Sequence, residues 1–143
     1  MQPPSVVCAG ILVADLFIPP LVRLPEAGDL IVTEDFLVQP GGCAANTAVS
    51  LTKLGVSVSV AGKVGLDMFG DAVERDLRSC GVRTDALSRS SSHSTSKTVI
   101  LPVIGEDRRY IHTIGANADF TVEDIAFKLA MQAQVFAQIL VPA

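Results

Sequence analysis

The segment 41–46, which reads GGCAAN, has residue types that could hold a polar ligand. Two glycines directly before a helix let the backbone approach a ligand closely, and they leave free N–H groups at the positive end of that helix. The side-chain amide of Asn46 can donate and accept hydrogen bonds, which suits two adjacent hydroxyl groups. The same residues also fit a plain strand-to-helix turn in which Asn46 satisfies nearby backbone groups, so both interpretations stay open.

Asp15 is a second candidate for ligand binding, because it directly follows the apolar run 6–14. We expect this run to form a strand that is covered on both faces, as in a parallel sheet. A carboxylate at the C-terminal end of such a strand lies where ligands of open α/β sheets bind. The alternative is a carboxylate that caps a loop or a helix.

Three other polar side chains need an interpretation. His112 alternates with Tyr110 along an expected strand, so it faces either a cleft or solvent, and we interpret it as a lid residue or substrate contact. Asn117 is a second possible substrate contact, although it also fits a turn or a cap. Lys63 does not belong to a nucleotide-binding P-loop, because Ser57 stands where that loop begins with glycine.

The elements that must position these residues alternate between strands and helices, with a hairpin inserted, which indicates an α/β domain. Asp67 is expected to cap the second helix, and Thr121 the third. Serines are concentrated in 88–96, which we expect to be a loop. We expect strands at 5–13, 30–38, 56–60, 82–87, 97–104, 108–114 and 135–141, and helices at 43–54, 68–80 and 122–132.

The pattern of these residues resembles the ribokinase/PfkB family of carbohydrate kinases. The glycines and small residues of 41–48, with Gly55, fall at the spacings of that family's N-terminal signature. The segment 62–71, GKVGLDMFGD, is similar to the GxVGxDxFG segment that follows it, and 115–118 also fits. The resemblance covers about residues 6–125. It implies a ribokinase-like, partly parallel three-layer sandwich with a small antiparallel lid near 15–22, 30–38, 97–104 and 108–114.

The resemblance also implies a function. Enzymes of this kind transfer the γ-phosphate of ATP, with Mg²⁺, to a hydroxymethyl group of a sugar or related alcohol. The residues that would hold the substrate hydroxyls are Asp15, Gly41, Gly42 and Asn46. The chain departs from ribokinase itself at Val13, where related kinases often have Asn, and at Cys43, where ribokinase has Lys. The sugar is therefore left open.

The family's C-terminal signature, Asp-Thr-x-Gly-Ala-Gly-Asp, does not occur in these 143 residues. In the family that segment supplies the general base and backbone donors for the developing phosphoryl charge. We therefore expect 1–143 to be the N-terminal, substrate-binding part of a ribokinase-like domain without the nucleotide-binding half. We expect no catalytic residue, no metal site, weak binding of ATP and Mg²⁺, and no activity of the chain alone. A non-catalytic sugar-binding or dimerisation module is the alternative; a nicotinamide-binding domain is disfavoured, because no GxGxxG follows the first strand.

The composition limits the other classes of protein. The formal net charge is −4 with a pI near 5.0, which argues against binding nucleic acid through a basic face. Apolar residues make up 49% and the mean hydropathy is +0.45, which excludes intrinsic disorder. No apolar run approaches the length of a membrane span. Three widely spaced cysteines indicate a reducing, cytoplasmic setting, and the apolar excess with an uncovered last strand favours a homodimer.

Overall fold

The computed structural model describes residues 3–125, 131 and 133–139, and its core is a parallel sheet. The strand order is β5-β4-β1-β8, in which β1 (Val6–Gly10) pairs in parallel with both β4 (Val58–Gly65) and β8 (Val135–Ile139). β5 (Arg83–Ser90) pairs in parallel with β4. The apolar sequence of β1 and β4 is explained by this arrangement, because both strands are buried between neighbours and on their faces.

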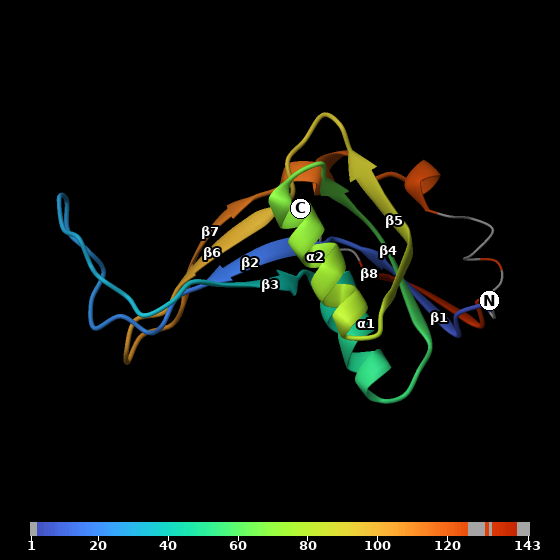
Figure 1. The fold of residues 1–143 in the computed structure, drawn as a ribbon, viewed down its shortest axis with the longest axis horizontal. Helices are drawn as coiled ribbons and strands as arrows, with labels where there is room; N and C mark the ends of the chain where they lie inside the picture. The colour runs from blue at the N-terminus through green and yellow to red at the C-terminus, as the bar shows by residue number, and fades with distance from the viewer. Residues whose placement is uncertain (1–2, 126–130, 132, 140–143) are drawn as a thin grey trace.

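Two helices cover one face of this sheet (Figure 1). α1 (Cys43–Lys53) begins after Gly42, and α2 (Met68–Ser79) begins after Asp67, which accepts a hydrogen bond from the Gly70 amide at 2.9 Å, as expected of an N-cap. Cys8 of β1 and Leu77 of α2 belong to the core cluster on this face. The opposite face is packed by residues near the end of the chain, since Val7, Ala9 and Ala61 form a second cluster with Ile125 and Ala133.

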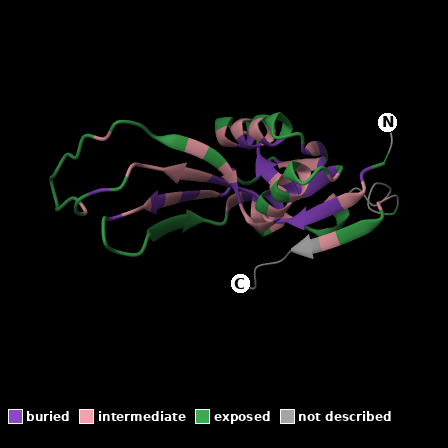
Figure 2. Cartoon of the chain, turned by 90° about the horizontal axis from the view of Figure 1, so that it is seen from below, coloured by how far each residue is buried: buried purple, intermediate pink, exposed green. Residues whose placement is uncertain are grey.

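A second four-stranded sheet extends away from this body, and we call it the lid sheet (Figure 1). Its order is β3-β2-β6-β7. β2 (Val13–Phe17) is antiparallel to β3 (Leu37–Gly41) and parallel to β6 (Lys97–Leu101), which is antiparallel to β7 (Arg109–Thr113). Exposed residues are concentrated on this sheet and the loop at its tip, whereas the first sheet is mostly buried (Figure 2).

The α/β class, both helices and the β6–β7 hairpin are confirmed, and the boundaries differ in several places. The expected strand 5–13 is shorter than predicted: β1 ends at Gly10, and a separate strand of the other sheet, β2, begins at Val13. Hydropathy could not reveal this break, because the residues around Gly10 are apolar on both sides of it. The strand expected at 30–38 is wrong for most of its length: β3 begins at Leu37, and Asp35 and its neighbours pair with no strand.

The other differences are smaller. The strand expected at 56–60 is shifted and longer, since β4 continues to Gly65, and Ser88–Ser90 belong to β5 rather than to a loop. The lid sheet is mixed instead of wholly antiparallel, because β2 and β6 run in the same direction.

The start of the third expected helix, residues 122–124, is a short 3-10 turn, whereas residue 131 near its expected end is helical. Thr121 and Asp124 form a capping box, but η2 (Val122–Asp124) ends at Ile125, whose backbone is extended. It follows η1 (Gly115–Asp119). Residues 126–130 and 132 of the expected helix, and 140–141 of the last strand, lie outside the described residues. None of the helices in the described ranges is long and apolar enough to cross a membrane.

Candidate functional site

Asp15 and Gly41 meet on one face of the lid sheet. The sequence analysis expected Asp15 at the C-terminal end of the first parallel strand. Asp15 instead lies inside β2, because the first strand, β1, already ends at Gly10. A Cβ atom on Gly41 would lie 1.9 Å from Oδ2 of Asp15 and 2.5 Å from its Cγ. No side chain other than hydrogen therefore fits at position 41 while the carboxylate keeps its place. The contact joins residues far apart in the sequence.

Gly42 serves a different purpose from its neighbour. Its φ is +87°, a conformation that L-residues with a Cβ rarely adopt, and an added Cβ would lie 2.4 Å from the carbonyl oxygen of Ile11. This glycine turns the chain from β3 into α1 against the linker between β1 and β2. The backbone N–H of Asn46 then donates to the Gly42 carbonyl at 3.0 Å, which is the first hydrogen bond of the helix.

Asn46 lies exposed in the first turn of α1, four residues after Gly42. Its side chain makes no hydrogen bond within the described part of the chain, so its amide is available to a ligand. It borders an open cavity of about 540 Å³ between β3 and the two helices, together with Gln39 and Pro40. Asn46 is thus joined to Gly42 through the backbone, but the residues that line its cavity do not include Asp15, Gly41 or Gly42.

The carboxylate of Asp15 stands in a row of polar side chains that crosses the lid sheet. Gln39, Asp15, Thr98 and His112 occupy successive paired positions of β3, β2, β6 and β7. The Thr98 hydroxyl lies 3.0 Å from Nδ1 of His112. Burial raises the pKa of the Asp15 carboxyl, while the Thr98 hydroxyl and the His112 imidazole act in the opposite direction. Thr98 was not singled out by the sequence, because only strand register places it between these two residues.

Asn117 is occupied by the backbone of the same region. Its Oδ1 accepts a hydrogen bond from the Leu12 amide at 3.1 Å, and its Nδ2 donates to the Leu12 carbonyl at 2.9 Å. The side chain therefore fastens η1 to the linker that separates β1 from β2. A contact between Asn117 and substrate remains a prediction, and it would compete with these two hydrogen bonds.

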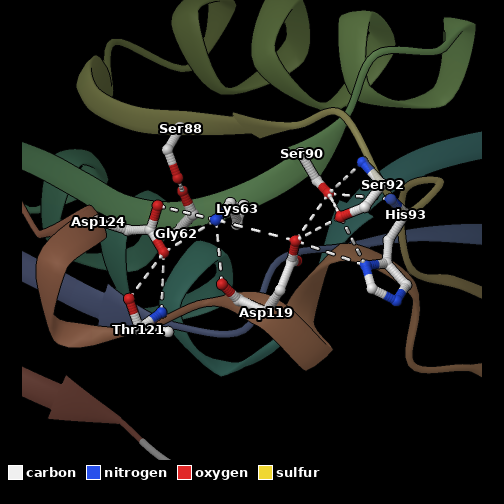
Figure 3. A network of polar contacts seen from close by, with 9 residues as sticks. All are labelled: Gly62, Lys63, Ser88, Ser90, Ser92, His93, Asp119, Thr121 and Asp124. Atoms are coloured by element: carbon white, nitrogen blue, oxygen red, sulfur yellow. Dashed lines mark hydrogen bonds and ion pairs between the residues drawn. The ribbon is translucent and has the colours of Figure 1, made fainter.

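A second polar cluster surrounds Lys63 (Figure 3). Its Nζ donates to Oδ2 of Asp124 and to the carbonyl oxygen of Asp119, both at 3.0 Å. Oδ2 of Asp119 accepts hydrogen bonds from Ser90 at 2.9 Å and from Ser92 at 3.0 Å. The cluster connects the end of β4 to η1 and η2. Sequence reasoning missed it, because its members are up to 61 residues apart.

This second cluster has mutually favourable charges. Hydrogen bonding to Asp124 raises the pKa of Lys63. Although burial opposes the shift, the bond from Lys63 lowers the pKa of the Asp124 carboxyl. Among the described residues no group of three His, Cys, Asp or Glu side chains is placed to hold a metal ion.

Comparison with known proteins decides the family. The model of the pfkB family of carbohydrate kinases matches residues 3–141, nearly the whole sequence. The chain belongs to this family. Among curated pfkB relatives, it is 37% identical over 99 residues to a ribokinase of Bacillus subtilis, covering 69% of this chain and 33% of the relative. It is 29% identical over 137 residues to a probable chloroplastic fructokinase of Arabidopsis thaliana, covering 94% of this chain and 34% of the relative.

Solved structures of pfkB kinases share the fold. A ribokinase of Arabidopsis thaliana, solved with ribose and ATP, superposes with a TM-score of 0.78 at 26% identity, over 96% of this chain and 45% of that one. A fructokinase of Xylella fastidiosa with bound ATP gives 0.76 at 28% identity, over 94% and 42%. The chain therefore spans about a third of the length of the curated relatives and less than half of the solved ones.

Proposed function

We propose that this chain is the sugar-binding part of an ATP-dependent carbohydrate kinase, and that Asp15, Gly41, Gly42 and Asn46 hold the hydroxyl groups of the sugar. The observation that carries the proposal is the contact between Asp15 and Gly41, since a glycine is required there only to leave space for the carboxylate. Family membership supports the reaction class. The ribokinases and fructokinases among its relatives support a sugar as substrate.

The geometry suits the recognition of a vicinal diol. An ionised carboxylate only accepts hydrogen bonds, so Asp15 would accept hydrogen bonds from two sugar hydroxyls. Bonds of this kind to a charged group are stronger than neutral ones. Asn46 could bind a hydroxyl oxygen from the start of α1, and His112 faces the same side of the lid sheet as Asp15.

Phosphoryl transfer would need groups that the described site does not contain. In this proposal Asp15 binds the sugar hydroxyls and does not act as the base that deprotonates them. The Asp-Thr-x-Gly-Ala-Gly-Asp segment, which supplies that base in the family, does not occur in these 143 residues. Loss of a general base and of donors to the developing charge together would remove several powers of ten in rate. We therefore propose that the 143-residue chain by itself binds ATP and Mg²⁺ weakly and transfers no phosphate.

A second role, dimerisation through the lid sheet, is favoured by its exposed apolar side chains. Leu30 is 89% exposed and Val32 87%, and both lie in the loop at the tip of the lid sheet. Val135 and Phe136 of the edge strand β8 are also exposed, at 53% and 41%. Apolar patches and open sheet edges of this kind recruit partners, and a two-fold homodimer is the commonest arrangement. A non-catalytic binding or dimerisation module therefore remains the alternative proposal.

The cysteines bear on the cellular compartment in which the protein works. Cys8, Cys43 and Cys80 are all free thiols in the structure. Free thiols are typical of a reducing compartment. We place the protein in the cytoplasm on this ground.

The proposal is tested by titrating the chain with D-ribose and D-fructose and following backbone amide signals by NMR. We expect shifts around Asp15 and Gly41, and their loss in Asp15→Asn. Asp107→Asn, at the exposed tip of the β6–β7 hairpin, is the matched control and should bind like the wild type. Equal binding by the two variants would refute the assignment of Asp15. A coupled assay for ADP release should give no signal above a blank with either sugar.

A further inference from the structure

The face of the lid sheet that carries Asp15 is divided into two rows of side chains. The first is the polar row already described, Gln39, Asp15, Thr98 and His112. The second row lies two residues further along each strand, toward the tip of the lid sheet. It consists of four large side chains that are mainly apolar, in the order Leu37, Phe17, Ile100 and Tyr110. A sugar also has hydroxyl-bearing edges and apolar C–H surfaces, so a polar row flanked by an apolar one matches its two kinds of surface.

Hydrogen-bond directions within the polar row determine what His112 offers a ligand. Asp15 and Thr98 are paired in the register of β2 and β6, and an ionised carboxylate can only accept, so a hydrogen bond between them would use the single hydroxyl proton of Thr98. In that arrangement the Thr98 oxygen accepts from Nδ1 of His112, 3.0 Å away. A neutral imidazole with its proton on Nδ1 has a free lone pair on Nε2. His112 is exposed, and its Nε2 has no partner within the described part of the chain.

We propose that His112, oriented by Thr98, is a second hydroxyl-binding point that selects which sugar the lid sheet accepts. This inference rests on the proposed sugar site, and it adds a residue that determines specificity. Adjacent strands lie about 4.8 Å apart, so His112 stands two strand spacings, or roughly 10 Å, from the backbone of Asp15. Because its imidazole points toward Thr98, the distance between the His112 ring and the Asp15 carboxylate is shorter than the distance between the two backbones. Asp15 would hold one pair of hydroxyls, and Nε2 of His112 would accept a hydrogen bond from a hydroxyl further along the sugar.

The proposal makes a prediction about the protein without ligand. The chain has only two histidines, His93 and His112, so their ¹⁵N ring signals can be assigned with the single variant His93→Gln. Imidazoles in water prefer the tautomer with the proton on Nε2. We expect His112 to show the opposite tautomer, with Nδ1 protonated, in the wild type and in Thr98→Ser. Thr98→Val, which removes the hydroxyl, should abolish this preference. A wild-type His112 protonated on Nε2 would overturn the inference.

The second test pairs protein variants with ligand variants. D-Fructose, D-ribose and their monodeoxy analogues are titrated into the wild type, His112→Leu and His112→Gln. We expect one analogue to bind about 5- to 10-fold more weakly than its parent sugar to the wild type, which is the effect of one lost hydrogen bond. That difference should disappear in His112→Leu and persist in His112→Gln, whose amide oxygen can take the place of Nε2.

The outcomes separate this inference from the proposed function. Sugar binding that depends on Asp15 but is the same in His112→Leu for every analogue would overturn the role of His112 and leave the sugar site standing. Absence of binding by every sugar tested would overturn both. Because β7 is an edge strand and His112 is exposed, its replacement should not unfold the chain. His93 belongs to the cluster around Lys63, since its Nδ1 lies 3.4 Å from Oδ2 of Asp119 (Figure 3). The variant His93→Gln should therefore bind all sugars like the wild type.

Discussion

The adjacent glycines of the GGCAAN segment should respond differently to the addition of one methyl group. In Gly41→Ala the new Cβ would lie 1.9 Å from Oδ2 of Asp15, against 3.4 Å or more for an ordinary contact. The obstacle is the end of a side chain, so the carboxylate can rotate away by about 1.5 Å. Gly41 does not have a positive φ, so alanine fits its backbone. We therefore expect Gly41→Ala to fold but to bind sugar much more weakly than the wild type.

The expected magnitudes follow from these contacts. Displacing the Asp15 side chain from its rotamer costs about 0.5–1.5 kcal/mol of folding free energy. Losing charged hydrogen bonds to a sugar costs about 1.5–3 kcal/mol of binding free energy, or roughly a 10- to 100-fold weaker affinity. Gly42→Ala meets the rigid carbonyl of Ile11 at 2.4 Å and keeps φ at +87°. It should destabilise the chain by about 2–4 kcal/mol.

A double-mutant cycle measures the contact itself. Unfolding by urea is followed for wild type, Gly41→Ala, Asp15→Ala and the double variant, and sugar affinity is measured by NMR. In the Asp15→Ala background the new methyl group meets no carboxylate, so Gly41→Ala should then cost less than about 0.5 kcal/mol. If Gly41→Ala binds sugar like the wild type, or if its cost is the same in both backgrounds, the reasoning is refuted.

Three further predictions concern stability and assembly. Asp67→Ala removes the acceptor of bonds from the Gly70 amide at 2.9 Å and the Thr95 amide at 2.8 Å, so urea denaturation should show a loss of about 2 kcal/mol, with Asp67→Asn losing less. Lys63→Met should lower Tm at pH 7. Against the effect of burial, Lys63 holds the pKa of the Asp124 carboxyl below its value in the unfolded chain. The stabilisation by this ion pair is therefore fully present above the unfolded pKa and is lost as pH falls through the folded pKa. The Tm difference between the variant and the wild type should thus shrink toward pH 3. Light scattering at tens of micromolar should give a mass above the 15.0 kDa of one chain, and Leu30→Lys with Val32→Lys should lower it; a soluble wild-type monomer would count against pairing through the lid sheet.

Features decided by neighbouring residues could be read directly from the sequence. Both helices were located within a residue or two, because Gly42, Gly55 and Asp67 act on the turn next to them. The β6–β7 hairpin followed from two strand-like runs around a glycine turn. The spacing of the GGCAAN and GKVGLDMFGD segments was enough to identify the family, since both motifs are local in the chain.

Features that depend on strand pairing were decided only in three dimensions. Nothing near Gly10 distinguishes one long strand from two strands of different sheets, since hydropathy is the same on both sides. The row from Gln39 to His112 exists because β2 is paired with β3 on one side and with β6 on the other, and register is set by packing rather than by adjacent residues. The sequence by itself therefore indicated which residues to propose for sugar binding, whereas the tertiary structure decided that Asp15 meets Gly41 and that Thr98 stands between Asp15 and His112 in the sheet.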